Sequence, residues 1–145
     1  MINYKVEILV GIPGSGKTTY SNEMEKKNFL IISQDKTGDK YQCIREYVSG
    51  LQFKRNVIID RTNITKDQRK IWIELAKAYG YNTIECNYFK IELRKAQERA
   101  IRRIGHENMD ILSTEKKKAV CEQLFSVLEL PTRREGFSKI RILNQ

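Results

Sequence analysis

Short apolar runs rich in β-branched residues recur along the chain. Runs of this length and composition predict buried strands, because β-branched side chains pack well on a pleated surface. The predicted strands are Val6–Val10, Phe29–Ile32, Val57–Ile59, the more polar Thr83–Phe89, and Ile140–Leu143.

Longer stretches between these runs carry apolar residues at helical spacing. Thr65 followed by Gln68 predicts a capping box at one helix start, and Gly80 and Gly105 stand where helices are predicted to end. The predicted helices are Lys17–Lys27, Lys40–Leu51, Lys66–Tyr79, Glu92–Ile104 and Glu115–Leu128.

The alternation of strands and helices predicts an α/β fold, with a parallel sheet and helices on both faces. The 145 residues fit one compact domain, so we expect residues 1–145 to form a single unit. Sheets of this kind bind ligands at the carboxyl ends of their strands. The loops after Val10, Ile32 and Ile59 are therefore where functional residues are expected.

The first of these loops matches a phosphate-binding motif. Residues 11–18 read GIPGSGKT between a predicted strand and a predicted helix, as the GxxxxGK(S/T) pattern of a P-loop requires. Glycines let backbone N–H groups turn toward phosphate oxygens, and the next helix directs its positive dipole end at them. Lys17 is expected to reach the β- and γ-phosphates of ATP, and the Thr18 hydroxyl to ligate Mg²⁺. The predicted nucleotide contacts are Gly11, Pro13, Gly14, Ser15, Gly16, Lys17, Thr18 and Thr19.

The second loop carries Asp35, which follows the strand Phe29–Ile32 within the sequence Ser-Gln-Asp. A carboxylate at this point can accept the proton of an attacking hydroxyl, as a general base does. It can equally cap the helix predicted to begin near Lys40, or act as a simple turn residue. The residues alone leave these interpretations open.

The third loop contains Asp60, Thr62 and Asn63. Asp60 ends an apolar strand, as the aspartate of a Walker B motif does, and is a candidate to hold Mg²⁺ through water. Thr62 and Asn63 have short hydrogen-bonding side chains that suit the orientation of a substrate. The alternative is turn chemistry, in which both side chains only satisfy backbone groups before the next helix.

A basic stripe lies on the fourth predicted helix, where Lys95, Arg99 and Arg103 recur at i, i+4 with Arg102 beside them. An arginine near a P-loop can neutralise charge on a transferring phosphoryl group. The alternative is an ordinary solvated face, with pairs such as Glu98–Arg102. Residues Lys116–Lys118 on the last helix are predicted to form a solvated turn, with a contact to the phosphate backbone of a nucleic acid as the alternative. The apolar face of the fourth helix comprises Leu93, Ala96, Ala100, Ile101 and Ile104.

Composition adds limits to this picture. The net charge of +9 favours an anionic partner, but ATP and many metabolites are anionic as well as nucleic acids. No apolar run is long enough to span a bilayer and no signal peptide pattern is present, which predicts a cytoplasmic protein without a membrane partner. The three widely spaced cysteines (Cys43, Cys86 and Cys121) are expected to be reduced core thiols.

Taken together, five segments resemble the kinase domain of polynucleotide 5′-kinases, a family with phage, bacterial and animal members. The resemblance covers nearly the whole chain, in order and with similar spacing. The segments are Gly11–Thr18, Ser33–Asp35, Val57–Asn63, Glu98–Arg103 and Arg134–Phe137.

The resemblance implies an adenylate-kinase-like P-loop fold that uses ATP and Mg²⁺ to phosphorylate the 5′-hydroxyl end of RNA or DNA. It implies that Asp35 is the general base and that Arg103, with Arg99, contacts the donor phosphates from a lid. Thr62 and Asn63 would lie on the acceptor side. It is also compatible with a homo-oligomer and with a phosphatase or ligase partner, fused or separate.

Three departures from the family pattern qualify these expectations. Gln34 and Gly38 stand where many members carry an arginine that contacts the acceptor, so that contact is either lost or supplied elsewhere, by Arg61, Lys36 or Lys40. The residue type at the Asp60 position varies among family members. No DxDGT-like phosphatase motif occurs, which indicates a lone kinase domain, natural or cut from a longer chain.

Two other functions remain compatible with these residues. The first is a P-loop kinase for a small metabolite or nucleoside, which should have a closed acceptor pocket. The second is a catalytically silent nucleotide- or RNA-binding module, which the intact Lys17, Thr18 and Asp35 argue against.

Overall fold

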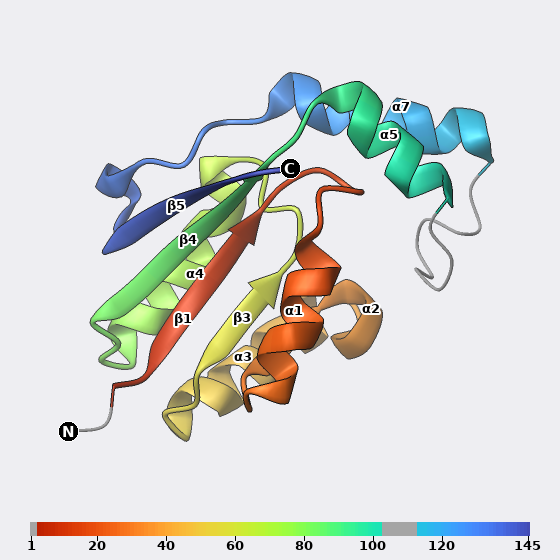
Figure 1. Ribbon diagram of the computed structural model, residues 1–145. Coiled ribbons are helices and arrows are strands. Elements are labelled where there is room, and N and C mark those ends of the chain that lie inside the picture. The colour runs from red at the N-terminus through yellow and green to blue at the C-terminus, as the bar shows by residue number, and fades with distance from the viewer. Residues whose placement is uncertain (1–2, 103–112) are drawn as a thin grey trace.

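A computed structural model describes residues 3–102 and 113–145. Five strands in this part of the chain form one sheet in the order β2-β3-β1-β4-β5, and every neighbouring pair is parallel. Each strand falls on one of the predicted apolar runs (Figure 1). The strands are β1 (Lys5–Val10), β2 (Leu30–Ser33), β3 (Val57–Asp60), β4 (Thr83–Lys90) and β5 (Lys139–Asn144).

Helices cover both faces of the sheet, as predicted. Helices α3 and α4 pack on one face and α1 packs on the other, while α5 and α7 form a hairpin above the carboxyl edge (Figure 1). None of the described helices is long and apolar enough to cross a membrane. The helices are α1 (Lys17–Lys26), α2 (Gln34–Thr37), α3 (Lys40–Gln52), α4 (Lys66–Ala78), α5 (Leu93–Arg102), α7 (Thr114–Val127) and the 3-10 helix η1 (Arg133–Glu135).

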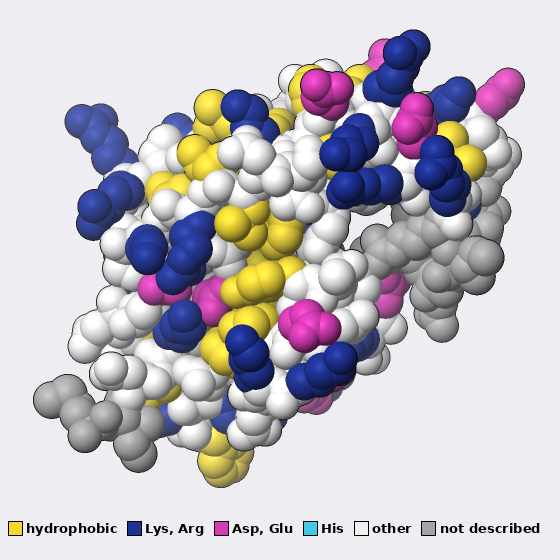
Figure 2. Space-filling view, viewed as in Figure 1, with side chains coloured by type: hydrophobic (Ala, Val, Ile, Leu, Met, Phe, Trp, Pro, Cys, Tyr) yellow, Lys and Arg dark blue, Asp and Glu magenta, His cyan; other side chains and the backbone are white. Residues whose placement is uncertain are grey.

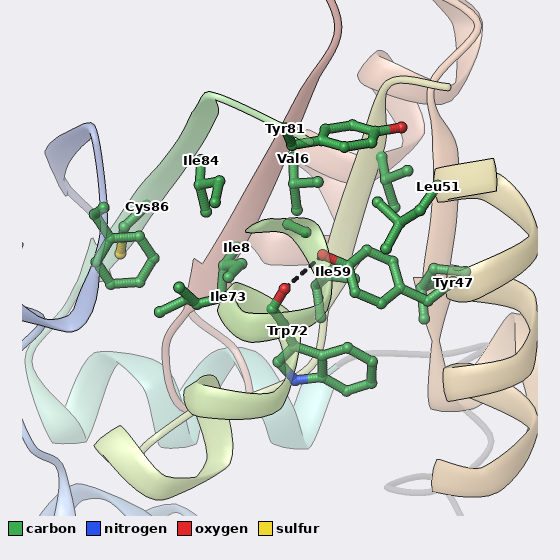
Figure 3. Packing of buried hydrophobic residues seen from close by; sticks show 14 of the residues in the cluster. Val6, Ile8, Tyr47, Leu51, Ile59, Trp72, Ile73, Tyr81, Ile84 and Cys86 are labelled. Carbon is green, nitrogen blue, oxygen red and sulfur yellow. Dashed lines mark hydrogen bonds between the residues drawn. The ribbon is translucent and has the colours of Figure 1, made fainter. Parts of the chain in front are cut away.

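The main core lies between the central strands and the helices α3 and α4 (Figure 3). Trp72 of α4 and Tyr47 of α3 are almost fully buried there, with their rings edge to face at 5.3 Å. The Tyr47 hydroxyl donates a hydrogen bond of 2.7 Å to the Trp72 carbonyl, which satisfies the buried polar group. This contact joins α3 to α4. The cysteines are free and buried, as predicted.

A polar network covers part of the opposite face of the sheet. The Lys5 ammonium lies 3.1 Å from carboxylate oxygens of both Glu7 and Glu85, and Arg141 of β5 lies 2.9 Å from Glu85. Asn87 donates to Glu7 at 2.6 Å. Because the buried carboxylates keep these partners, β1, β4 and β5 are linked by charge as well as by backbone hydrogen bonds.

This network should make stability depend on pH. Burial would raise the pKa of Glu85, but hydrogen bonds from Arg141 and Lys5 outweigh it and hold that pKa below its ordinary 4.5. The stabilisation is therefore present above pH 4.5 and is lost as the pH falls through the lower pKa that Glu85 has in the folded protein. We expect the free energy of unfolding in urea to fall below pH 4.5.

The variant Glu85→Gln should be about 1 kcal/mol less stable than wild type at neutral pH, because its partially exposed partners are screened by water. The difference should shrink as the pH falls. The exposed Glu23 pairs only with the exposed Lys26, so Glu23→Gln is the control and should change little. Parallel pH curves for Glu85→Gln and wild type would contradict this assignment.

Two local features differ from the prediction. Residues Gln34–Thr37 form the short helix α2, which the sequence pattern did not predict; Ser33 caps it by accepting a hydrogen bond from the Lys36 backbone N–H. Lys117 is only 8% exposed, so the predicted solvated turn Lys116–Lys118 is wrong at its centre. Packing of α7 on α5 and the P-loop buries this one position.

Candidate active site

The P-loop connects β1 to α1 and has the backbone shape that its glycines predict. Gly14 and Gly16 adopt φ values of 84° and 103°, in the left-handed region that a side chain disfavours. Gly16 is also the N-cap of α1 and provides no side-chain cap. The first-turn N–H groups of α1 are thus available to an anion.

Lys17 lies across this loop. Its ammonium donates to the carbonyl oxygens of Gly11 and Ile12 at 2.8 and 3.1 Å, and the residue is only 8% exposed. Ser15 Oγ is sealed from solvent and has no hydrogen-bond partner within the described residues. A buried cation, an uncapped helix start and an unpartnered hydroxyl together fit a nucleotide phosphate.

The predicted magnesium ligands lie at the ends of neighbouring elements. Thr18 is in the first turn of α1 and Asp60 ends β3, where it accepts a 2.8 Å hydrogen bond from Ser21 of α1. Among residues 3–102 and 113–145 no group of three or more His, Cys, Asp or Glu side chains could hold a metal. These residues fit Mg²⁺, which retains several waters and takes its remaining ligands from substrate phosphates. Direct binding by Thr18 and Asp60 stays a prediction.

Asp35 lies in the first turn of α2, with an exposed side chain. The cap of α3 is Asp39, whose side chain accepts from the Gln42 N–H at 2.9 Å and completes a capping box with Gln42. The interpretation of Asp35 as the cap of α3 is therefore wrong. Ser33 pairs with Asp60 in the sheet, so Asp35 follows directly on the strand beside the third loop.

The third loop is tied to the P-loop by its backbone. The Gly11 N–H donates to the Thr62 carbonyl at 3.0 Å, and Asn63 donates its side-chain amide to the Leu9 and Arg61 carbonyls at 2.8 and 3.2 Å. Asn63 adopts a φ of 48°, which asparagine tolerates better than most residues. The backbone-satisfying alternative thus describes the amide nitrogen of Asn63, and its contact with substrate stays a prediction.

Arg69 is hydrogen-bonded to the backbone of this loop, a role that was not predicted from the sequence. It is fully buried, forms an ion pair of 2.7 Å with Glu135, and donates to the Asn63 carbonyl at 2.8 Å. Glu135 belongs to the C-terminal segment that resembles the family, and Phe137 of the same segment is buried in the main core. This distant segment therefore positions the site through Arg69. A single buried arginine at helical spacing gives no sequence signal for such a pair.

A small pocket opens beside the third loop, between the first turns of α3 and α4. Its volume is about 210 Å³ and we call it the β3-loop pocket; it is lined by Lys40, Arg61, Thr62, Asn63, Gln68 and Trp72. The lining carries two cations and no carboxylate. Of the three cations predicted to contact the acceptor, Lys36 lies elsewhere and pairs with Glu25 at 2.8 Å.

A larger cleft of about 1060 Å³ lies on the other side of the P-loop, and we call it the P-loop cleft. Figure 2 shows Lys and Arg side chains gathered over α5 and α7, and a hollow surface between this hairpin and α1. The structure thus brings Arg99 to the P-loop, as predicted, whereas Arg103 lies outside the described residues. The cleft is lined by Gly14, Gly16, Thr19, Arg99 and Arg102, among others.

The α5 helix is seated directly on the P-loop. A side chain at Gly14 would lie 2.3 Å from the Ala96 carbonyl, so glycine is required there by contact as well as by φ. Ala96 and Ala100 of the predicted apolar face of α5 are buried, whereas Ile104 of that face lies outside the described residues. The predicted Glu98–Arg102 pair is present at 4.0 Å. The small side chains allow the hairpin, and with it Arg99, to approach the phosphate-binding backbone.

The fold and this site define a P-loop kinase domain. The chain belongs to the AAA domain family, whose model matches residues 6–131. Relatives that are named as bifunctional polynucleotide phosphatase/kinases confirm the resemblance to the kinase domain of polynucleotide kinases.

Two curated relatives align with almost all of the chain. It is 28% identical over 137 residues to the bifunctional polynucleotide phosphatase/kinase of Schizosaccharomyces pombe, covering 94% of this chain and 32% of the relative. It is 31% identical over 145 residues to the transcription factor bHLH140 of Arabidopsis thaliana, covering 93% of this chain and 15% of the relative. The chain thus spans a third or less of these relatives.

Solved structures confirm the fold. A fungal RNA kinase superposes with a TM-score of 0.76 at 13% identity, covering 98% of this chain and 76% of that one. A gluconokinase from Sinorhizobium meliloti 1021 superposes with a TM-score of 0.65, also at 13% identity, covering 99% and 84%. Because kinases with different acceptors share this fold, the acceptor has to be argued from the site.

Proposed function

We propose that this domain transfers the γ-phosphoryl group of ATP to the 5′-hydroxyl end of RNA or DNA. The attacking 5′-oxygen forms a bond to the γ-phosphorus, the bond to the bridging β-γ oxygen breaks, and ADP leaves. Asp35 takes the proton of the hydroxyl. Lys17, Arg99 and Arg103 stabilise the charge that develops on the phosphoryl oxygens, and Mg²⁺ would neutralise the donor phosphates.

The β3-loop pocket is the observation that carries the choice of acceptor. Two cations without a carboxylate favour an anionic group. Its volume of about 210 Å³ is smaller than the 300 Å³ or more typical of pockets that enclose a small molecule. A pocket of this size suits one phosphate of an acceptor whose remainder lies outside, as in a polynucleotide.

A panel of acceptors tests this proposal. Radiolabelled ATP is offered to 5′-hydroxyl RNA and DNA oligonucleotides, 3′-mononucleotides, nucleosides and sugars. We expect label on the oligonucleotides and, more weakly, on the 3′-mononucleotides, since both carry a phosphate next to the reacting sugar. Preferential labelling of a nucleoside or sugar would instead establish a metabolite kinase. ATP binding without labelling of any acceptor would establish a binding module.

The variant Arg61→Ala should raise KM for the oligonucleotide about 10- to 100-fold, because one charged hydrogen bond to phosphate is lost. KM for ATP should change little, since Arg61 lines only the acceptor side. Steady-state kinetics with each substrate varied in turn measure both effects. The control is Lys36→Ala, which removes the same charge from a residue already paired with Glu25. Equal KM values for the two variants would remove Arg61 from the acceptor site.

A further inference from the structure

One face of α7 carries a buried lysine. The two buried residues of this helix are Lys117 and Cys121, which are four positions apart and so lie on the same face. Lys116 and Lys118, on either side, are exposed. Lys117 thus sits where the helix packs against the rest of the domain, and its flanking lysines do not.

This face of α7 is turned toward the P-loop. Cys121 Sγ lies 3.8 Å from the Pro13 carbonyl oxygen and packs against Ala100 of α5. Burial raises the pKa of the Cys121 thiol, and the nearby charge of Lys17 acts in the opposite direction. Side chains on a helix lean toward its N-terminus, so Lys117 lies on the same face one turn beyond Cys121.

None of the described residues provides a counter-charge for Lys117. Within the described residues its ammonium has neither an ion pair nor a hydrogen bond, although the residue is only 8% exposed. An ammonium that is partly removed from water without an anion is less stable, because it loses hydration without compensation. Ser15 Oγ is the one sealed, unpartnered side-chain atom of the described residues, so the Lys117 ammonium still borders open space. That space can admit an anion.

We infer that Lys117 binds a phosphate oxygen of the nucleoside triphosphate seated on the P-loop. In the free domain its charge is uncompensated, and the bound triphosphate supplies the missing anion. Lys117 would thus be a further donor-side cation, contributed by α7 in addition to Lys17, Arg99 and Arg103. The inference rests on nucleotide binding within the proposed function, and it is independent of the acceptor.

Lys117→Met, which keeps length and removes charge, tests this inference. We expect the melting temperature of the ligand-free protein to rise slightly, because an unpaired and partly desolvated charge is gone. We expect the dissociation constants of ATP and ADP, measured by calorimetry without an acceptor, to rise about tenfold, as for the loss of one charged hydrogen bond. Adenosine binding should be unchanged. Lys117→Arg should recover most of the ATP affinity, and the exposed controls Lys116→Met and Lys118→Met should behave like wild type.

Three results would overturn the inference. They are unchanged ATP affinity in Lys117→Met, an equal loss of adenosine and ATP affinity, and a loss confined to oligonucleotide binding. The first of these, in a protein that still phosphorylates 5′-hydroxyl ends, would leave the proposed function intact. If Lys117→Met lost ATP affinity tenfold while the wild-type protein labelled only a sugar, the inference about Lys117 would hold and the proposed acceptor would be wrong. Wild-type protein that binds no adenine nucleotide would overturn both.

Discussion

Replacement of Lys17 by alanine is expected to lower the rate of phosphoryl transfer by about a hundredfold or more, while the fold is retained. The Lys17 ammonium lies against the Gly11 and Ile12 carbonyls, at the start of the helix that faces the phosphates. Its charge is directed at oxygens on which negative charge builds up during transfer, where such stabilisation has its largest effect. Turnover of the folded variant, with ATP and a 5′-hydroxyl oligonucleotide, measures the loss.

The control for this variant is Lys26→Ala, at the other end of α1. Lys26 is exposed and makes only a 3.4 Å pair with Glu23, so its loss should leave turnover near wild type. Thermal unfolding of both variants shows whether α1 is still formed. A folded Lys17→Ala protein with turnover like that of Lys26→Ala would remove the P-loop from the mechanism.

The variant Asp35→Asn is expected to lower the rate of transfer by about a hundredfold to ten-thousandfold, the usual range for a positioned base. The amide keeps the shape of the side chain but cannot take the proton of the 5′-hydroxyl. ATP affinity should change little, because Asp35 follows β2 on the acceptor side and no donor contact is proposed for it. Rate, ATP binding and thermal stability are measured on the same preparation.

The structure supplies a matched control four residues away. Asp39 caps α3, so Asp39→Ala should cost about 1 kcal/mol of stability and leave turnover per folded molecule close to wild type. The two variants thus separate a chemical role from a capping role. A destabilised Asp35→Asn protein with normal turnover per folded molecule would sink the general-base assignment.

The donor and acceptor cations of the site come from different elements. Arg99 lines the P-loop cleft on α5, a helix whose alanines let it sit directly on Gly14. Arg61 lines the β3-loop pocket beside Lys40 and opposite the buried Trp72. Donor and acceptor cations therefore lie on opposite sides of the P-loop and the third loop, an arrangement that suits in-line transfer between two substrates.

The positions of the strands and helices, and the P-loop, could be predicted from local sequence patterns. Strand and helix periods are local properties, and every predicted strand begins and ends within one residue of the observed strand. The P-loop could be predicted because Gly14 and Gly16 have to adopt φ values that few other residues allow. The capping box of α4 could be predicted because Thr65 and Gln68 are only three positions apart in the chain.

Local signals were less decisive at the second loop. The spacing of Asp39 and Gln42 is that of a capping box and could have been found, whereas Asp35 was the residue considered as the cap. Helix α2 is a single turn whose start depends on one Ser33 hydrogen bond, too little sequence for a periodic pattern to appear. The position of Asp35 in a helical first turn thus needed the structure.

Which charged residues serve the site depends on the packing of whole elements. Lys36, Lys40 and Arg61 were equivalent in the sequence, but Glu25 of α1 engages the first and the β3-loop pocket takes the other two. Arg69 meets Glu135 across 66 positions of the chain. Such pairings depend on how whole elements pack, because no local pattern specifies which distant residue a side chain will face. The burial of Lys117 among exposed lysines has the same origin: its helix was predicted, but the face that meets the P-loop is set by the packing of α7 on α5.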